Sequence, residues 1–429
     1  MMISYAKVKI WGVRVGLIVW NKDGNYAAFE YDKDFWRQGL KLSPIELPLS
    51  ENAKENIFSF RNSFVDRSST FKGLPGLLAD SLPDRFGSKI INEWLKSEGR
   101  KANSLNPVEK LCFIGKRGMG SLEFEPEKPA PTNKSSKIEI SGLVKIARDI
   151  LSEKETFMES LDKKSWLDIF QVGTSAGGAR PKAIIAFNPK TKEVRSGQVD
   201  APAGFSHWII KFDGVKKDDN DKIIKGHERI EFAYYLMSKD CGIDMTECRL
   251  YEEKDLAHFM TRRFDRDGNR KIHVQTLSAL RHFDYDGTNS YEDLFDTMMM
   301  LELPNAQFEQ MFRRMVFNVL AVNSDDHTKN FSFMMDRDRA WKISPAYDVT
   351  FILSEDPWGN PSRASSINGK TRNITRFDFW DIARKYGVKK PDDIIKEVSA
   401  VLKNWKRYAD KAKVKPEMRD MIDKMIIRM

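Results

Sequence analysis

The chain has 429 residues, of which 41% are hydrophobic and 31% charged, and its formal net charge is +9. This length allows two or three domains with substantial cores, and the composition excludes disordered and fibrous proteins. No apolar run approaches the ~18 residues that a membrane span needs. Three cysteines without a C-x-x-C pair exclude a disulfide framework and give no sign of a zinc site. Because the first residues lack the layout of a secretory signal, we expect a cytoplasmic protein.

The positive charge is concentrated near the C-terminus. Residues 370–429 carry 17 Lys and Arg against 9 Asp and Glu, a net charge of +8. Basic residues such as Lys403, Lys406 and Arg407 accompany Trp405 and Tyr408 there. This asymmetry fits a surface for nucleic acid or an acidic partner, but it also fits the solvated faces of amphipathic helices.

The first part of the chain is predicted to be rich in strands. Residues 7–11, 13–20 and 26–31 are enriched in β-branched and aromatic residues, and turn residues at 21–24 separate the last two runs. A loop-rich stretch follows, with a helix expected through residues 90–95. The segment 125–137 contains three prolines and is the best candidate for a linker.

Beyond the linker, the predicted elements change in character. We expect a helix over 138–151, strands over 182–187 and 208–212 around a polar hairpin, and a helix over 229–239. From about residue 274 the chain is predicted to be mostly helical, except between 323 and 346. Strands with one helix among them, followed by a helical half, are the order expected of an α+β, two-lobed protein-kinase-like fold with a mixed β N-lobe and a mainly helical C-lobe.

A polar cluster after the predicted helical run 315–322 has the spacing of a kinase catalytic loop. Phosphoryl transfer from ATP needs a carboxylate that accepts the proton of the substrate hydroxyl, and an oxygen ligand for the metal on the phosphates. In kinases these Asp and Asn residues are five positions apart, as are Asp325 and Asn330. Lys329 could place a positive charge near the transferred group.

A second carboxylate follows the cluster. Asp348 stands where a kinase places the residue that chelates Mg²⁺, although its context is Tyr-Asp-Val. Trp341 and Lys342 indicate a short hairpin that carries it.

The upstream half offers groups that could bind phosphates. Lys211 lies on an apolar strand, where a kinase has its phosphate-binding lysine, and Glu231 on the next helix is its expected ion-pair partner. A flexible loop whose backbone amides could cradle phosphates comes before them. Ala179 and Arg180 replace the Lys-Ser/Thr of a Walker A loop, which disfavours a P-loop NTPase. The loop residues are Gly173, Thr174, Ser175, Ala176, Gly177 and Gly178.

Each feature alone has a structural alternative. Lys211 could be an edge-strand lysine, Asp325 or Asp348 could cap a turn, and the glycine loop could be a hairpin. Glu231 could lie on a solvated helix face. Their occurrence together in kinase order makes these alternatives much weaker.

In combination, the motifs resemble the HipA serine/threonine kinases, the toxins of bacterial toxin–antitoxin pairs. Residues 175–182 resemble the glycine-rich loop of that family, 325–332 its catalytic loop and 344–348 its metal-binding segment. Residues 78–87 resemble its small N-terminal subdomain. The resemblance covers nearly the whole chain and implies an extra HipA-type N-terminal subdomain at 1–130, a kinase N-lobe at 138–265 and a helical kinase C-lobe at 266–429.

The resemblance also implies a role for each site residue. ATP and Mg²⁺ are the expected cofactors, with Asp325 as the catalytic base, Asn330 and Asp348 as metal ligands, and Lys211 on the phosphates. Lys182 would face the nucleotide, and backbone groups at Arg263 and Phe264 would hold adenine. Arg262 stands where family members often have an acidic residue, which puts side-chain contacts to adenine in doubt. Ser175 falls at the position where HipA kinases phosphorylate themselves. In that family the modification expels the loop and switches the kinase off.

The expected partners are a protein substrate and a small helix-turn-helix antitoxin similar to HipB, with DNA bound mainly through that antitoxin and no membrane. The best-studied behaviour of the family is phosphorylation of an aminoacyl-tRNA synthetase, the glutamate–tRNA ligase, but no residue here selects that target. Two other functions stay open: a catalytically weak co-repressor scaffold, and a metal-dependent hydrolase with Asp325, Asp326 and His327 as ligands. The hydrolase does not explain Lys211 or the glycine loop.

Overall fold

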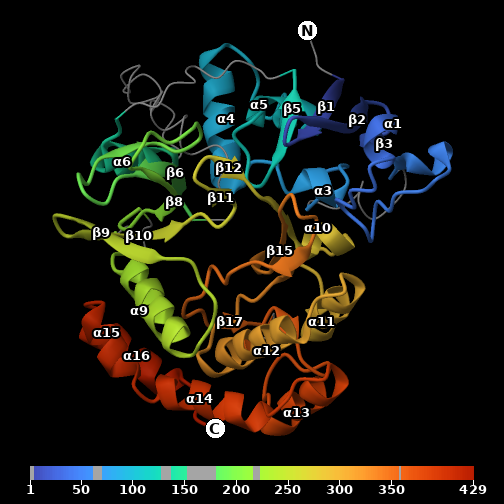
Figure 1. Cartoon of the computed structure of the whole chain (residues 1–429). Helices are drawn as coiled ribbons and strands as arrows, with labels where there is room; N and C mark the ends of the chain where they lie inside the picture. Colours follow the sequence, from blue (N-terminus) through green and yellow to red (C-terminus); the bar gives the residue numbers. More distant parts are fainter. Residues whose placement is uncertain (1–3, 61–69, 127–136, 152–179, 216–222, 357–358) are drawn as a thin grey trace. The chain divides into compact units, whose positions relative to one another are not determined.

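A computed structural model describes residues 4–60, 70–126, 137–151, 180–215, 223–356 and 359–429 (Figure 1). The chain forms two compact units. The first contains Met1–Lys225 and Tyr251–Val274, and the second contains Gly226–Leu250 and Gln275–Met429. The predicted glycine loop, including Ser175, lies outside the described residues.

The first unit begins with an antiparallel sheet in the strand order β4-β3-β2-β1-β5. In β1, Ala6, Val8 and Ile10 are buried and alternate with more exposed residues, which is the period of a strand with one face on a core. The elements of this region are β1 (Tyr5–Ile10), β2 (Val13–Asn21), β3 (Tyr26–Tyr31), α1 (Lys33–Trp36), the 3₁₀ turn η1 (Ala53–Asn56), β4 (Ile57–Ser59), α3 (Gly76–Ala79), α4 (Arg85–Ser97), α5 (Pro107–Ile114) and β5 (Leu122–Glu125).

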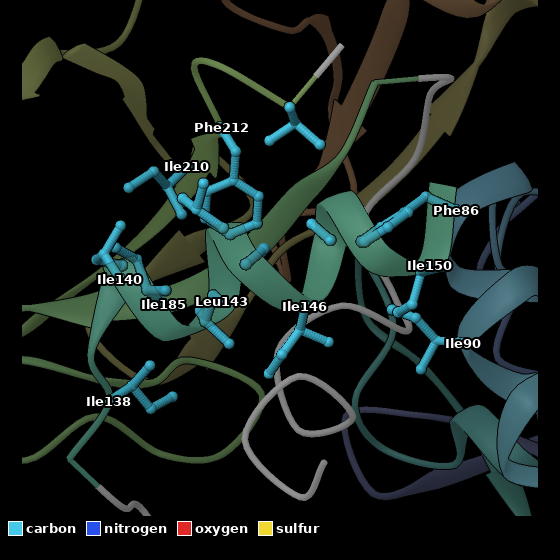
Figure 2. Packing of buried hydrophobic residues seen from close by; sticks show 14 of the residues in the cluster. Phe86, Ile90, Ile138, Ile140, Leu143, Ile146, Ile150, Ile185, Ile210 and Phe212 are labelled. Atoms are coloured by element: carbon cyan, nitrogen blue, oxygen red, sulfur yellow. The ribbon is translucent and has the colours of Figure 1, made fainter. Parts of the chain in front are cut away.

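A second sheet has the order β7-β6-β8-β10-β9. All six residues of β6 are buried, as expected of an interior strand. Apolar side chains from α4 and α6 join those of β6 and β8 in one cluster, in which Ile90, Ile146 and Ile185 take part (Figure 2). The elements are α6 (Ile140–Leu151), β6 (Lys182–Phe187), β7 (Val194–Ser196), β8 (Ser206–Lys211), β9 (Cys248–Glu253), β10 (Leu256–Arg262), β11 (Arg266–Asp267) and β12 (Arg270–Lys271).

The second unit is mainly helical. Strand β13 (His273–Thr276) leads into it from the first unit. Its helices are α9 (His227–Asp240), α10 (Leu277–Arg281), α11 (Tyr291–Met300), α12 (Asn305–Leu320), α13 (Arg376–Lys385), α14 (Pro391–Leu402), α15 (Trp405–Lys411) and α16 (Pro416–Met425). The remaining elements are short: β14 (Asn289–Ser290), the 3₁₀ turn η2 (Thr328–Asn330), β15 (Ser332–Met335), β16 (Trp341–Ile343), β17 (Ser354–Glu355), β18 (Pro361–Ser362) and β19 (Ser365–Ser366).

The C-terminal aromatic residues belong to the core of this unit. Trp405 is fully buried, and its ring lies 5.6 Å from that of Tyr234 on α9. The hydroxyl of Tyr408 donates to Asp240 at 2.6 Å. The neighbouring Lys403, Lys406 and Arg407 are exposed, so these basic side chains are available for contact with a partner.

Most predicted elements are confirmed. The strand predicted at 182–187 is β6, the helix at 138–151 is α6, and the hairpin around Trp341 consists of β15 and β16. Helix α9, which the sequence places in the N-lobe, groups with the helical unit. No helix of the described ranges is both long and apolar enough to cross a membrane.

Candidate active site

The predicted catalytic loop begins directly after α12. Val322 adopts a positive φ of 56°, which is unusual for a β-branched residue, and the next N–H, that of Asn323, donates back to Asn318 O at 2.9 Å. Asn323 also forms a parallel bridge with Ile352. The chain therefore turns sharply at the end of α12, and the segment around Ile352 holds it directly after the turn.

Asp325 and Asn330 lie together at the two ends of this loop. The side-chain amide of Asn330 donates from Nδ2 to the backbone oxygen of Asp325 at 2.6 Å. This bond directs the amide so that Oδ1 is the atom left to hold a metal. The carboxylate of Asp325 is 46% exposed, and His327 Nε2 lies 3.8 Å from its Oδ1. A carboxylate with this exposure can reach a substrate hydroxyl.

Asp348 is held beside the same loop. Tyr347 donates its hydroxyl to the backbone oxygen of Lys329 at 2.7 Å, which ties the residue before Asp348 to the residue before Asn330. Asn330 and Asp348 also line one small pocket in this unit. Asp348 has a φ of 51°, a conformation that Asp tolerates better than most residues and that often occurs at functional sites. The two predicted metal ligands are thus brought together.

Lys329 contacts an aromatic ring outside this loop. Its ammonium lies 4.3 Å from the centre of the Tyr285 ring, a cation–π contact.

Glu231 is buried on α9 in the same unit, at 1% exposure. Lys211 belongs to the first unit, so its pairing with Glu231 stays a prediction.

In the first unit, two lysines face each other across neighbouring strands. Lys182 on β6 is the register partner of Lys211 on β8, and both are buried, at 4% and 6% exposure. Burial raises the pKa of the nearby Asp84 to about 7, although Lys182 opposes this shift. Like charges directly opposite each other destabilise a sheet, and the carboxyl of Asp84 is close enough to Lys182 to interact with it. Phosphate binding by the two lysines stays a prediction.

The predicted adenine segment is tightly engaged within its own unit. The guanidinium of Arg263 is fully buried and holds Asp265 through two bonds of 2.8 and 2.6 Å. Arg266 binds the same carboxylate at 2.7 Å, and Gly120 donates its N–H to it at 2.8 Å. Although burial opposes ionisation, the two arginines hold the pKa of Asp265 well below its usual range.

One backbone group of this segment is already hydrogen-bonded within the protein. The N–H of Arg263 donates to His207 O at 2.9 Å, and Phe264 is half-buried. Adenine binding at Arg263 and Phe264 stays a prediction that depends on their remaining backbone groups.

Asp326 is the polar residue whose role the sequence reasoning missed. Its side chain is fully buried and accepts hydrogen bonds from Arg363 and from the Tyr291 hydroxyl. These partners are 37 and 35 residues away, so no local motif identifies them. Since its carboxylate is occupied, Asp326 does not fit the set of three metal ligands that the hydrolase alternative requires.

The comparisons with known proteins cover both parts of the chain. A family model described as the HipA N-terminal domain matches residues 6–125, and one described as the HipA-like C-terminal domain matches residues 174–406.

Two curated proteins are similar to part of the chain. "Putative kinase Y4dM" of Sinorhizobium fredii is 24% identical over 232 residues, and a "Putative kinase" of Haemophilus influenzae is 26% identical over 223 residues. These alignments cover 48% and 42% of this chain, but only 54% and 65% of the relatives' own lengths.

A solved structure shares the fold over nearly the whole chain. It is the HipA of a Shewanella oneidensis toxin–antitoxin complex of HipA, HipB and operator DNA. The TM-score is 0.66 at 17% identity, and the match covers 98% of this chain and 94% of that one. The predicted two-lobed α+β fold is therefore confirmed. With more than half of its residues matched by one family model, the chain belongs to the HipA family.

Proposed function

We propose that this chain is an ATP- and Mg²⁺-dependent serine/threonine protein kinase that acts as the toxin of a toxin–antitoxin pair. The observation that carries this proposal is the geometry around the catalytic loop. Asn330 is bonded to the backbone of Asp325 and shares a pocket with Asp348. An accessible carboxylate beside two oxygen ligands is what metal-assisted phosphoryl transfer requires.

The residues present fit both cofactors. Carboxylate and amide oxygens are the ligands that Mg²⁺ prefers, and Asn330 and Asp348 supply them. Bound Mg²⁺ would neutralise charge on the phosphate oxygens. Lys182 and Lys211 would bind phosphates, and the loop 173–178 would cover them. Asp325 would accept the proton of the substrate hydroxyl, while Lys329 would stabilise charge on the transferred group.

The expected partners follow from family membership. The similar Shewanella protein was solved with HipB and operator DNA, and we infer that this chain likewise binds a helix-turn-helix antitoxin and reaches DNA mainly through it. The substrate would be a cellular protein. Ser175 would be the site of self-phosphorylation, as at the corresponding position of the family. The roughly −1.5 to −2 charges of a phosphoserine there would repel the phosphates of ATP and weaken ATP binding.

The test is transfer of labelled phosphate. Purified protein incubated with Mg²⁺ and γ-labelled ATP should label itself or an added lysate protein, and Asp325→Asn should nearly abolish labelling. Asp338→Asn is the matched control, because Asp338 is an exposed carboxylate in the nearby turn between β15 and β16. Nucleotide binding without any labelling would favour the co-repressor scaffold.

A further inference from the structure

Asp326, the residue after the proposed base, is the centre of a buried polar network. Its carboxylate is fully buried and accepts from Arg363 Nη2 at 2.5 Å and Nε at 3.2 Å, and from the Tyr291 hydroxyl at 2.7 Å. Burial raises the pKa of Tyr291 well above its ordinary value, so the phenol stays protonated and donates. Loss of any of these partners would leave a buried polar atom without its hydrogen bond, which is costly.

The backbone of the catalytic loop is held by the same segment. Ser365 donates from its N–H to Asp326 Oδ1 at 3.2 Å and from its hydroxyl to the backbone oxygen of Asp326 at 2.5 Å. The N–H of Ala364 donates to Ser324 O at 2.9 Å. Ala364 and Ser365, the residue before β19 and its first residue, therefore fix the loop on both sides of Asp325.

The first turn of α11 completes the network. A capping box between Ser290 and Asp293 sets the start of this helix, so Tyr291 is its first residue. Asn318 on α12 donates to the Tyr291 oxygen at 3.1 Å. Tyr291 is thus held from two helices while it bonds to the catalytic loop.

We propose that Arg363 and Tyr291 are positioning residues, which act through Asp326 to fix the carboxylate of Asp325 where it accepts the substrate proton. This inference rests on the proposed kinase function. Neither residue needs to touch ATP or substrate. Displacing a catalytic group by about 1 Å typically costs on the order of 100-fold in rate, so a loosened anchor should slow transfer without weakening nucleotide binding.

The experiment uses variants that remove single bonds. Tyr291→Phe removes only the phenol hydroxyl, and Arg363→Lys keeps the charge but loses one of the two nitrogens that bind Asp326. The matched controls are Tyr386→Phe, which breaks a 2.7 Å bond to Asp296 on α11, and Arg313→Lys, which weakens a 2.7 Å ion pair with Glu397. The measurements are the labelling rate at saturating Mg-ATP, the Kd of a fluorescent ATP analogue, and amide hydrogen exchange of residues 323–331.

The expected result is a loss of roughly 10-fold for Tyr291→Phe and about 100-fold for Arg363→Lys in labelling rate, with the Kd changed less than about two-fold. Exchange over 323–331 should rise in both variants and not in the controls. Because both act through one carboxylate, the double variant should lose less than the product of the single losses.

Two outcomes would overturn the inference: rates within two-fold of the unmodified protein, or unchanged exchange in the loop. An unmodified protein that labels nothing would refute the proposed function instead, and the exchange measurement would still decide whether Arg363 and Tyr291 anchor the loop.

Discussion

Replacing Asp325 and replacing Asp348 should impair the protein in different ways, because Asp325 is proposed to accept a proton and Asp348 to bind a metal. Loss of a general base costs ~10²–10⁴ in rate, so Asp325→Ala should nearly abolish transfer while ATP still binds. Asp348→Ala should weaken Mg²⁺-dependent ATP binding. Titration of a fluorescent ATP analogue with and without Mg²⁺, beside a labelling assay, separates the two. Near-normal self-labelling by Asp325→Ala would refute the assignment of the base.

The residues of this site differ in how far the sequence identifies them. Asp325 and Asn330 are five positions apart, and the bond between them is local, so their spacing was sufficient to predict that they lie together. The partners of Asp326 come from α11 and from the segment around Arg363. Contacts between segments so far apart depend on tertiary packing, which a single sequence does not encode in any short pattern.

At the scale of elements, α15 gives a direct test of packing. Trp405 is fully buried, and its Nε1 donates to Arg419 O at 2.8 Å. Replacing a buried aromatic residue by Ala costs about 3–5 kcal/mol, so Trp405→Ala should lower the free energy of unfolding by that amount, measured by urea denaturation. Trp405→Phe keeps a ring and should lose less. Equal stability of Trp405→Ala and the unmodified protein would contradict this packing.

The exposed basic residues at the end of α14 and in α15 test the charge asymmetry. If these residues contact DNA phosphates in the complex with antitoxin, each contact adds about 0.9 to the log–log salt slope of binding. Reversing Lys403, Lys406 and Arg407 to Glu should then flatten that slope. Reversal of the exposed Lys190 and Lys192 before β7 is the control. An unchanged slope would identify the C-terminal basic residues as merely solvated, consistent with the 3.4 Å approach of Lys406 to Asp423.

Element prediction succeeded where the local pattern is strong. Strand β6 was predicted at its observed bounds because an apolar run is flanked by turn residues. The two-residue strands β14 and β19 were not predicted. They pair in parallel, and Ser365 of β19 also bonds to the catalytic loop. Two residues carry no periodicity, so only the tertiary structure defines such pairs.

For the whole molecule, buried histidines predict a loss of stability in acid. Burial lowers the pKa of His258, His273 and His282 from 6.5 to about 4. Between these values the unfolded chain binds protons that the folded chain does not, so the free energy of unfolding falls as the pH drops from about 6.5 towards 4. At pH 5 the loss should be roughly 2 kcal/mol for each histidine.

Urea unfolding at pH 7 and pH 5 measures this effect. His258→Gln should reduce the difference in unfolding free energy between the two pH values, since glutamine does not titrate. If the variant and the unmodified protein show the same difference, His258 is not buried in its neutral form.

The clamp formed by Arg263, Asp265 and Arg266 has a consequence for recombination between relatives. It grips the 118–120 loop through the Gly120 N–H and the oxygens of Gly118 and Gly120. Although the two family models match separate stretches of sequence, this grip makes the stretches interdependent. In a chimaera that exchanges residues 6–125 alone, the two arginines and the carboxylate would be buried against a 118–120 loop from another protein. That loop need not place its backbone N–H and carbonyl groups where the clamp binds them. Viable hybrids should therefore inherit the 118–120 and 263–266 segments from the same parent.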